Sequence, residues 1–131
     1  MYELLNITCF AFHSGLILFI VFGWIWRKTR WIHLFAAVLT AFSWFGAGLF
    51  YGLGYCPFTE WHWRVRVHLG HVDMPRSYIK FLVDQLTGLN VPAFWVDAVT
   101  LAAFFIAAAL SIGLTVRDWR RSKAEAQAES R

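Results

Sequence analysis

One cysteine, three histidines and two arginines fall within a single stretch of sixteen residues, CPFTEWHWRVRVHLGH, which runs from Cys56 to His71. Thiol and imidazole groups bind zinc, and a thiol beside an imidazole supplies the nucleophile and base of thiol enzymes. The residues that could do this chemistry are Cys56, His62, His68 and His71. Whether they meet depends on the local structure.

The spacing of these histidines argues against a metal site. On a helix, His62 and His68 face different sides, because a zinc pair on one helix face needs a spacing of three or four. His68 and His71 have that spacing, but Gly70 between them is expected to end the helix. In a strand, His62 and His68 would share a face, but the two arginines between them would repel a cation. We therefore predict no metal site, and interpret the stretch as interfacial aromatic anchors with polar residues facing lipid headgroups.

Residues 60–69 are ambiguous between helix and strand. Apolar and polar residues alternate, which is a strand pattern. An isolated strand at a membrane surface would, however, leave its backbone groups unpaired. Thr59 as an N-cap and Gly70 as a stop suit a short helix, and we expect a helix.

His13 lies inside the first apolar segment, with Cys9 one turn before it. Polar groups at that depth usually face protein or a cavity. We expect His13 to hydrogen-bond within the protein, to Ser14, Ser43 or a backbone carbonyl group. Ligation of a haem iron by His13 is the alternative, and a disulfide between Cys9 and Cys56 is a further possibility.

His13 and His33 are not expected to bind one haem. The first two apolar segments form a hairpin centred between Lys28 and Thr29, so residues at equal depth have numbers that sum to about 57. Trp44 is then level with His13, and the two histidines differ by roughly 16 Å in depth. We interpret His33 as a residue of the inner interface.

Asp97 is the one acidic residue within the apolar segments. It could pair with the basic residues of the stretch 62–68, and so belong to a polar network there. It could equally be an acid at the start of a helix, favoured by the helix dipole.

Composition indicates a membrane protein. Of the 131 residues, 59% are hydrophobic and only 15% charged, and 13 Phe and 8 Trp exceed what so short a chain could bury in water. The net charge of +4 comes from basic residues at the ends of apolar segments. That placement is typical of membrane orientation and contact with anionic lipid, so nucleic acid is not an expected partner.

The predicted fold is all-α, with three transmembrane helices over residues 4–26, 31–55 and 91–116. The segment 56–90 between the second and third spans is predicted to be a short amphipathic cap in the interface. Its second half reads as a helix with Asp73 as N-cap and Gly88 as stop. Residues 1–116 form the membrane domain, and 117–131 form a polar basic tail that continues the helix for a turn or two.

The basic residues also predict orientation. Eight lie on the side of the first turn and the tail, and four lie on the other side. The positive-inside rule then places the N-terminus outside and the tail in the cytoplasm of a bacterial inner membrane.

Small residues recur at a spacing of four in two spans, which is typical of close helix packing. The predicted packing positions are Gly48, Gly52, Ala103, Ala107, Ala109 and Gly113.

Several short motifs resemble a family of small bacterial membrane proteins catalogued as domain of unknown function 2784. They are FHSGLILFIVFGW in the first span, WIHL after the basic turn, CPFT after the second span, and SYIKFL beyond it; they cover roughly residues 10–85. The resemblance implies that the family pattern includes His13, His33, Trp44, Cys56, Pro57 and Thr59. The family usually has an acidic residue in the second span near the position of SWFGAG, and this chain has none there.

Three functions are consistent with the sequence. The first is a non-catalytic accessory or structural subunit of a larger inner-membrane complex, with the bilayer and other membrane subunits as partners. The second is a binder of haem, quinone, pigment or lipid that uses His13, Trp44 and the outer cap. The third is a thiol or metal enzyme at Cys56, His62, His68 and His71. No cofactor is required by any motif, although haem or lipid would suit the second function.

Overall fold

The structure is a computed structural model that describes residues 1–131, and it is all-helical, as predicted. The helices are α1 (Tyr2–Phe22), α2 (Arg30–Ala41), the π-helical turn η1 (Phe42–Ala47), α3 (Gly48–Tyr51), α4 (Pro57–His68), α5 (Tyr78–Thr87) and α6 (Ala93–Glu129). Three helical stretches are long and apolar enough to cross a membrane: Tyr2–Phe22, Arg30–Tyr51 and Ala93–Glu129.

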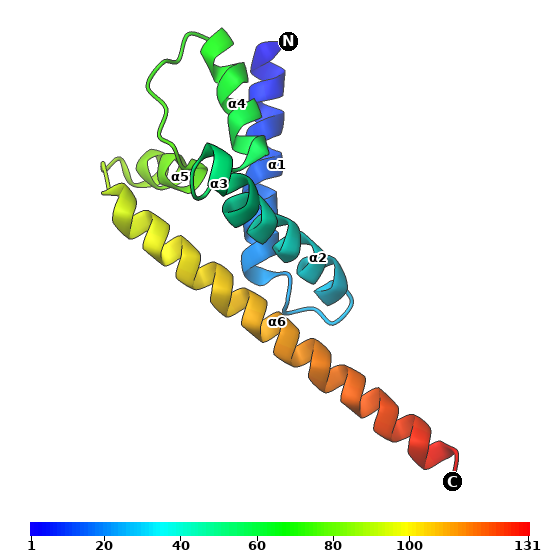
Figure 1. Cartoon of the computed structure of the whole chain (residues 1–131). Coiled ribbons are helices and arrows are strands. Elements are labelled where there is room, and N and C mark those ends of the chain that lie inside the picture. Colours follow the sequence, from blue (N-terminus) through cyan, green and yellow to red (C-terminus); the bar gives the residue numbers. More distant parts are fainter.

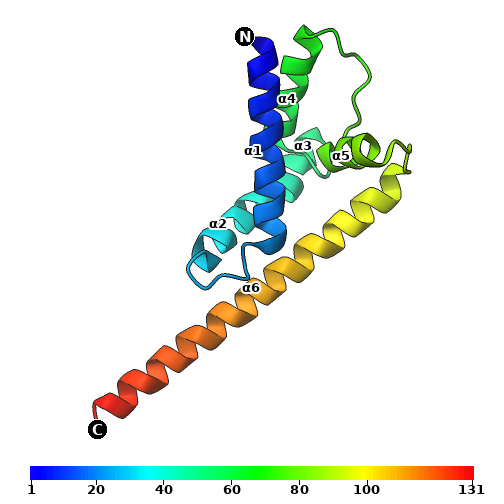
Figure 2. The same cartoon turned by 180° about the vertical axis from the view of Figure 1, so that it is seen from behind.

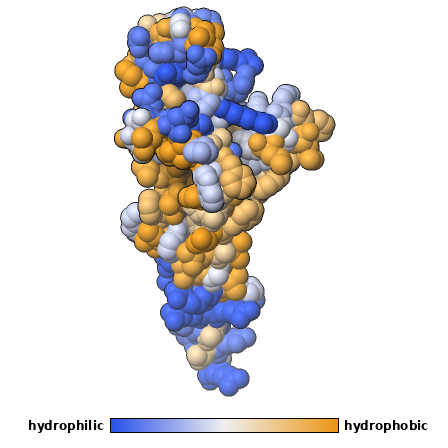
Figure 3. Space-filling view, turned by 90° about the vertical axis from the view of Figure 1, so that its left-hand side faces the viewer, coloured by the Kyte–Doolittle hydropathy of each residue, from blue (hydrophilic) through white to orange (hydrophobic).

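The three spans cross one another at open angles rather than forming a parallel bundle (Figure 1). The run α2–η1–α3 leans across α1, and the long α6 passes the lower end of both. Helix α4 lies alongside the upper half of α1, and α5 lies crosswise to them, as the reverse view also shows (Figure 2). Figure 3 shows that the middle of the molecule is mainly apolar and that the end carrying the C-terminus is hydrophilic.

Helix α1 ends at Phe22, earlier than the predicted Trp26, because the next residues turn back to satisfy its last carbonyl groups. A helix end leaves its last carbonyls without intrahelical partners, and lipid cannot supply any. Here side chains donate to them: His33 Nε2 to Ile20 at 2.8 Å, Trp24 Nε1 to Val21 at 2.7 Å and Thr29 Oγ1 to Gly23 at 2.7 Å. His33 is therefore a fully buried cap on the end of α1.

The second span ends at Tyr51, four residues earlier than predicted, because Gly52 adopts φ +103° and cannot continue the helix. The chain then folds back over η1, and Ser43 Oγ donates to the carbonyl of Tyr55 at 2.8 Å. Gly48 packs against the backbone of Leu53 in this fold-back. Gly48 and Gly52 thus do not form the predicted helix-packing pair, since one of them lies outside the helix.

The core lies where the spans cross. Ile20, Ala37 and Phe104 form its buried centre, and Trp44 packs on Phe104 with ring centroids 5.1 Å apart. Ala107 is buried on the same face of α6, with Ala103 partly buried one turn before it. This pair of small residues therefore packs within the protein.

Helix α6 continues to Glu129 rather than ending a turn or two after the apolar segment. Residues 117–129 are rich in Ala, Glu, Lys and Arg and contain no Gly or Pro, so their propensity sustains the helix. Arg30 of α2 is buried and pairs with Asp118 of α6, which places the basic turn and the tail at the same end of the molecule.

The segment between the second and third spans contains two short helices, so the expectation of a helix over residues 60–69 is confirmed. Cys56, not Thr59, is the N-cap of α4, with Pro57 in its first turn, and α4 ends at His68, just before Gly70. Helix α5 begins at Tyr78 and not near Asp73, and the predicted stop at Gly88 holds.

The late start of α5 has a local cause. The Trp63 indole donates to the carbonyl of Pro75 at 3.0 Å, which anchors the preceding loop in a non-helical path. Within α5, Lys80 Nζ donates to Asp84 Oδ2 at 2.6 Å, and it also donates to the carbonyl of Val91, ahead of α6, at 2.8 Å. The first of these bonds lowers the pKa of the Asp84 carboxyl group, and together they tie α5 to the start of α6.

Candidate functional site

Helix α4 packs antiparallel to the first half of α1 and brings histidines of both helices together. The His68 ring stacks on Tyr2 with centroids 4.8 Å apart, and His62 Nε2 donates to Asn6 Oδ1 at 2.8 Å. At the start of α4, Cys56 Sγ lies 4.0 Å from His13 Nε2.

The position of Cys56 corrects the depth expected from the hairpin. The rule that residue numbers sum to about 57 is off by one helical turn near the hairpin, where His33 meets Ile20 rather than Trp24, because α1 ends at Phe22. It is wrong further up, because the second span leans away from α1 and the chain folds back after Tyr51. Cys56 therefore lies beside His13 instead of level with Met1, and both cysteines are free thiols.

Tyr78 of α5 closes this cluster. Its ring stacks on the His13 imidazole, with centroids 4.0 Å apart and planes 4° apart. Its hydroxyl donates to the Phe10 carbonyl at 3.2 Å and lies 3.0 Å from Ser14 Oγ. The aromatic stack holds His13, so the expected hydrogen bonds from His13 to Ser14 or Ser43 are not made.

Three buried polar atoms in this region have no protein partner: His13 Nδ1, His62 Nδ1 and Arg66 Nε. A buried unpaired polar atom costs about 1–3 kcal/mol, so each is a place where a polar guest would be stabilising. Burial first, and then the nearby Arg66 guanidinium, lower the pKa of His62 below 6.5. Burial raises the pKa of Tyr78. At neutral pH the His62 and Tyr78 side chains are therefore uncharged hydrogen-bonding groups.

A hollow of about 330 Å³ opens beside Cys56. Its walls include Tyr51 and Tyr55, stacked at 4.7 Å, together with Trp63 and Arg76. The Arg76 guanidinium lies against Gly52 so closely that a Cβ there would meet it at 1.7 Å. Chemically, the hollow offers aromatic surface, one thiol, the Arg64–Glu60 ion pair and the guanidinium of Arg76, which makes no ion pair. These walls suit an amphipathic guest with a polar or anionic group near Arg76.

No group of three or more His, Cys, Asp or Glu side chains is arranged to hold a metal ion. His33 uses both ring nitrogens within the protein, because Nε2 donates to Ile20 and Nδ1 lies 3.0 Å from Ser111 Oγ. His33 could ligate a metal only by giving up one of these bonds.

The comparison with family models gives one match. The model described as Protein of Unknown function (DUF2784) matches residues 3–116. The chain belongs to this family. No curated protein and no solved structure gives a significant match.

The match covers all the apolar segments of this DUF2784 protein and both short helices. The residues that the motifs assigned to the family pattern fall in two places. His13, Cys56, Pro57 and Thr59 lie at the contact of α1 with α4, whereas His33 and Trp44 lie where the spans cross. These residues therefore lie at two packing centres of this chain.

The structure brings together His13, Cys56 and His62, but not the other candidate residues. His68 donates from Nδ1 to the Arg64 carbonyl at 2.8 Å, one turn away, and His71 is exposed after α4. Asp97 is exposed near the start of α6 and makes no ion pair, so of its two alternatives the pairing with the basic stretch is not seen. Trp44 packs on Phe104 and not beside His13. A thiol or metal centre of Cys56, His62, His68 and His71 is thus not assembled.

Sequence reasoning missed three members of the cluster: Asn6, Arg66 and Tyr78. One signal was available, because Asn6 is seven residues before His13 and so lies on the same face of α1. Nothing in the sequence pairs Tyr78 with His13, since the contact depends on how α5 crosses the other helices.

Proposed function

We propose that this DUF2784 protein is a non-catalytic accessory subunit of a larger membrane complex, and that α6 carries its docking face. The observation that carries this proposal is a line of small exposed residues on α6. Ala98, Ala102, Ala109 and Gly113 are all exposed and follow one another at spacings of four, seven and four residues, which keeps them on one helix face.

This line of small residues lies opposite the face that packs inside the protein. The inward face carries Phe104, Ala107 and Ser111, all buried. On the outward face a Cβ added to Gly113 would meet nothing within 4 Å. The outward small residues are therefore not packed against other helices of this chain.

Lipid gives no reason for small residues on a helix surface, whereas another helix does. Between membrane helices, small residues let the backbones approach and increase van der Waals contact. Exposed Phe105 and Ile106 flank the line and would supply apolar contact at its sides. A transmembrane helix of another subunit is the occupant that suits this surface.

The proposal includes a bacterial inner-membrane location with the N-terminus outside and the tail in the cytoplasm. Its support is the gathering of Arg27, Lys28 and Arg30 at the same end as the basic residues of the tail. Helices α4 and α5 would then lie at or near the outer interface. A membrane-impermeant thiol reagent tests this in a variant whose two natural cysteines, Cys9 and Cys56, are replaced by Ser: a cysteine introduced at Ser130 should react only after the membrane is opened.

The docking face is tested by purifying the tagged full chain from its native membranes in mild detergent. A distinct membrane protein should co-purify at fixed stoichiometry, and Gly113→Leu with Ala109→Leu should reduce its recovery about tenfold, which corresponds to about 1.4 kcal/mol. Ala11→Leu is the matched control, because Ala11 is exposed on α1. Recovery of this chain alone, or equal loss with Ala11→Leu, would overturn the proposal.

A second candidate is the binding of an amphipathic small molecule in the hollow beside Cys56. The observation that favours it is the meeting of Tyr51, Tyr55 and Trp63 with Arg76 around that space. A quinone or a lipid suits these walls. Extraction of the purified protein followed by mass spectrometry should recover such a molecule, and Arg76→Gln should reduce it; a guest that is retained unchanged by Arg76→Gln would count against this site.

A further inference from the structure

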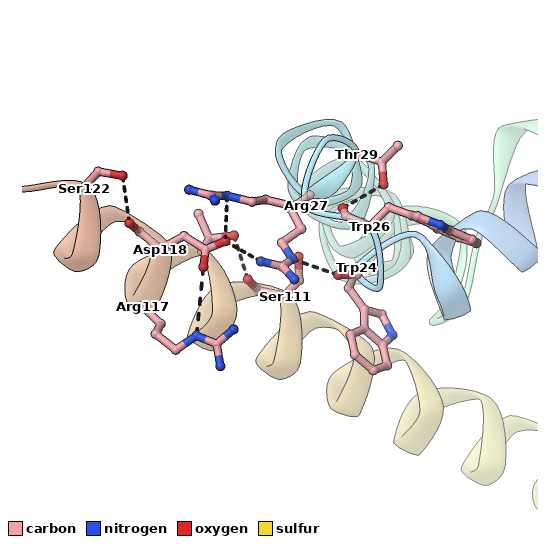
Figure 4. A network of polar contacts seen from close by, with 10 residues as sticks. Trp24, Trp26, Arg27, Thr29, Ser111, Arg117, Asp118 and Ser122 are labelled. Atoms are coloured by element: carbon pink, nitrogen blue, oxygen red, sulfur yellow. Dashed lines mark hydrogen bonds and ion pairs between the residues drawn. The ribbon is translucent and has the colours of Figure 1, made fainter. Parts of the chain in front are cut away.

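A second hollow, at the opposite end of the molecule, has a different chemistry. It lies between the turn that joins α1 to α2 and the last part of α6, and it encloses about 380 Å³. Its walls include Arg27, Lys28, Arg30, Trp31, Asp118 and Trp119. We call it the basic hollow, and Figure 4 shows its polar contacts.

One carboxylate in the basic hollow is shared by three guanidinium groups. Asp118 Oδ2 faces Arg30 Nη1 and lies 3.4 Å from Arg27 Nε, and Asp118 Oδ1 lies 3.9 Å from Arg117 Nε. In Figure 4, Arg27 and Arg117 approach this carboxylate from either side. Lys28 adds a fourth cation and makes no ion pair. The site therefore keeps an excess of positive charge that no side chain neutralises.

Arg30 and Asp118 are held in place before any ligand arrives. The Arg30 side chain is only 10% exposed, and its Nε donates to the Trp24 carbonyl at 2.9 Å. The turn after α1 therefore holds Arg30, and Arg30 in turn holds Asp118. By contrast, the Arg27 side chain is 72% exposed and Lys28 is exposed, so their remaining N–H donors can reach an incoming anion.

Apolar surface continues directly from the basic hollow along both helices. Trp31 and Trp119, 71% and 57% exposed, flank it. Beyond them, towards the middle of the spans, α2 exposes Phe35 and α6 exposes Ile112. An anion that carries acyl chains would place its charged group among the cations and its chains on this surface, whereas a free anion would leave the surface unused.

We infer that the basic hollow binds the phosphate group of an anionic membrane lipid. Arg27 and Lys28 contact the phosphate, and Arg30 and Asp118 hold the site open between α2 and α6. The acyl chains lie beside Trp31 and Phe35. This site is independent of the docking face on the outward side of α6 and needs no partner subunit.

The test uses the full chain in nanodiscs or detergent with defined lipids, and native mass spectrometry counts bound lipid. Phosphatidylglycerol should bind more tightly than phosphatidylcholine. The variant Arg27→Gln/Lys28→Gln should lose this preference by roughly tenfold or more, since each basic residue near a membrane surface contributes about 1 kcal/mol. Both side chains are exposed, so the variant is expected to fold.

The matched control is Arg120→Gln/Arg121→Gln, which removes the same charge from exposed positions outside the basic hollow and should keep the preference. An equal loss in that control would overturn the site, because it would show attraction by net charge alone. Equal binding of the two lipids would also overturn it. If inorganic phosphate at millimolar concentration displaced phosphatidylglycerol, the ligand would be free phosphate and the assignment to lipid would be wrong.

Discussion

His33 donates from Nε2 to the carbonyl oxygen of Ile20 at 2.8 Å, and so one residue of the second span closes the end of the first. The other ring nitrogen lies 3.0 Å from Ser111 Oγ of α6, which joins the third span to the same imidazole. Because His33 is fully buried, the Ile20 carbonyl group depends on this imidazole for its side-chain partner. This single side chain therefore links all three spans.

Replacing His33 by Leu should lower the free energy of unfolding by about 2 kcal/mol, because it leaves the Ile20 carbonyl unpaired. Ser111→Ala should cost less, about 0.6 kcal/mol and at most about 1.7 kcal/mol, the average and the maximum for hydrogen bonds between membrane helices. Unfolding in mixed micelles with increasing denaturing detergent measures both. His71→Leu, at an exposed loop position, is the control; equal stability of the His33 and His71 variants would contradict the capping role.

Gly52 is expected to be far less tolerant of Ala than Gly54. Both have positive φ, +103° and +82°, so either substitution costs about 1–3 kcal/mol in backbone strain. Only at Gly52 would the new Cβ also strike the Arg76 guanidinium, while at Gly54 it meets nothing. The melting temperature of Gly52→Ala should therefore be lower than that of Gly54→Ala. Adding Arg76→Ala to both variants should reduce the difference between their melting temperatures. An unchanged difference would show that contact with the Arg76 guanidinium is not its cause.

The pKa of His62 predicts how stability changes with pH. Because this pKa is lowered from 6.5 in the folded protein, the unfolded chain binds more protons below that pH. Stability should be constant above about pH 6.5 and should fall as the pH decreases below it, by at most about 1.4 kcal/mol per pH unit from this residue.

His62→Gln keeps an N–H donor for Asn6 but cannot titrate, so its melting temperature should fall less on acidification than that of the natural protein. The groups around His62 are Asn6 and His13 on α1, Arg66 on α4 and Tyr78 on α5, and all remain in both proteins. If the melting temperatures of the two proteins fell by the same amount between pH 7 and pH 5, the assignment of this pH dependence to His62 would be refuted.

The sequence was sufficient for the parts of the fold that depend on local pattern. Apolar length predicted the three spans, and Gly88 marked the end of α5. Hydropathy reports which residues tolerate lipid, but it carries no information on the angle at which two spans cross. The hairpin rule was therefore off by one helical turn for His33, which meets Ile20 instead of Trp24, and it failed completely for Cys56, where the helices have separated.

The polar clusters were harder to predict because their members are far apart in sequence. His13 and Cys56 are 43 residues apart, and Arg30 and Asp118 are 88 apart. From the sequence, Arg30 reads as one more basic residue that orients the chain, and its burial becomes visible only when α6 is seen to cross the turn. Asn6 was the exception, because helix periodicity alone places it on the face of His13.

Asp118→Asn should have an effect that depends on the lipid. In phosphatidylcholine it leaves the largely buried Arg30 without its counter-ion, which should cost about 2 kcal/mol, below the 3–5 kcal/mol of a fully buried pair. In phosphatidylglycerol a lipid phosphate in the basic hollow can take the place of the carboxylate, so the loss should be smaller. The free energy of unfolding of the natural protein and of Asp118→Asn, measured in each lipid, gives the two losses of stability to be compared.

The control for that comparison is Asp73→Asn, since Asp73 is exposed and makes no ion pair, and it should change stability in neither lipid. A loss of the same size for Asp118→Asn in both lipids would mean that no phosphate reaches Arg30, which would count against the lipid site. Suppose instead that Asp118→Asn loses less stability in phosphatidylglycerol than in phosphatidylcholine. If this difference between the lipids disappears when Arg27 and Lys28 are also replaced by Gln, the compensation by lipid depends on those two side chains. This compensation would then depend on the same cations that are inferred to hold the headgroup.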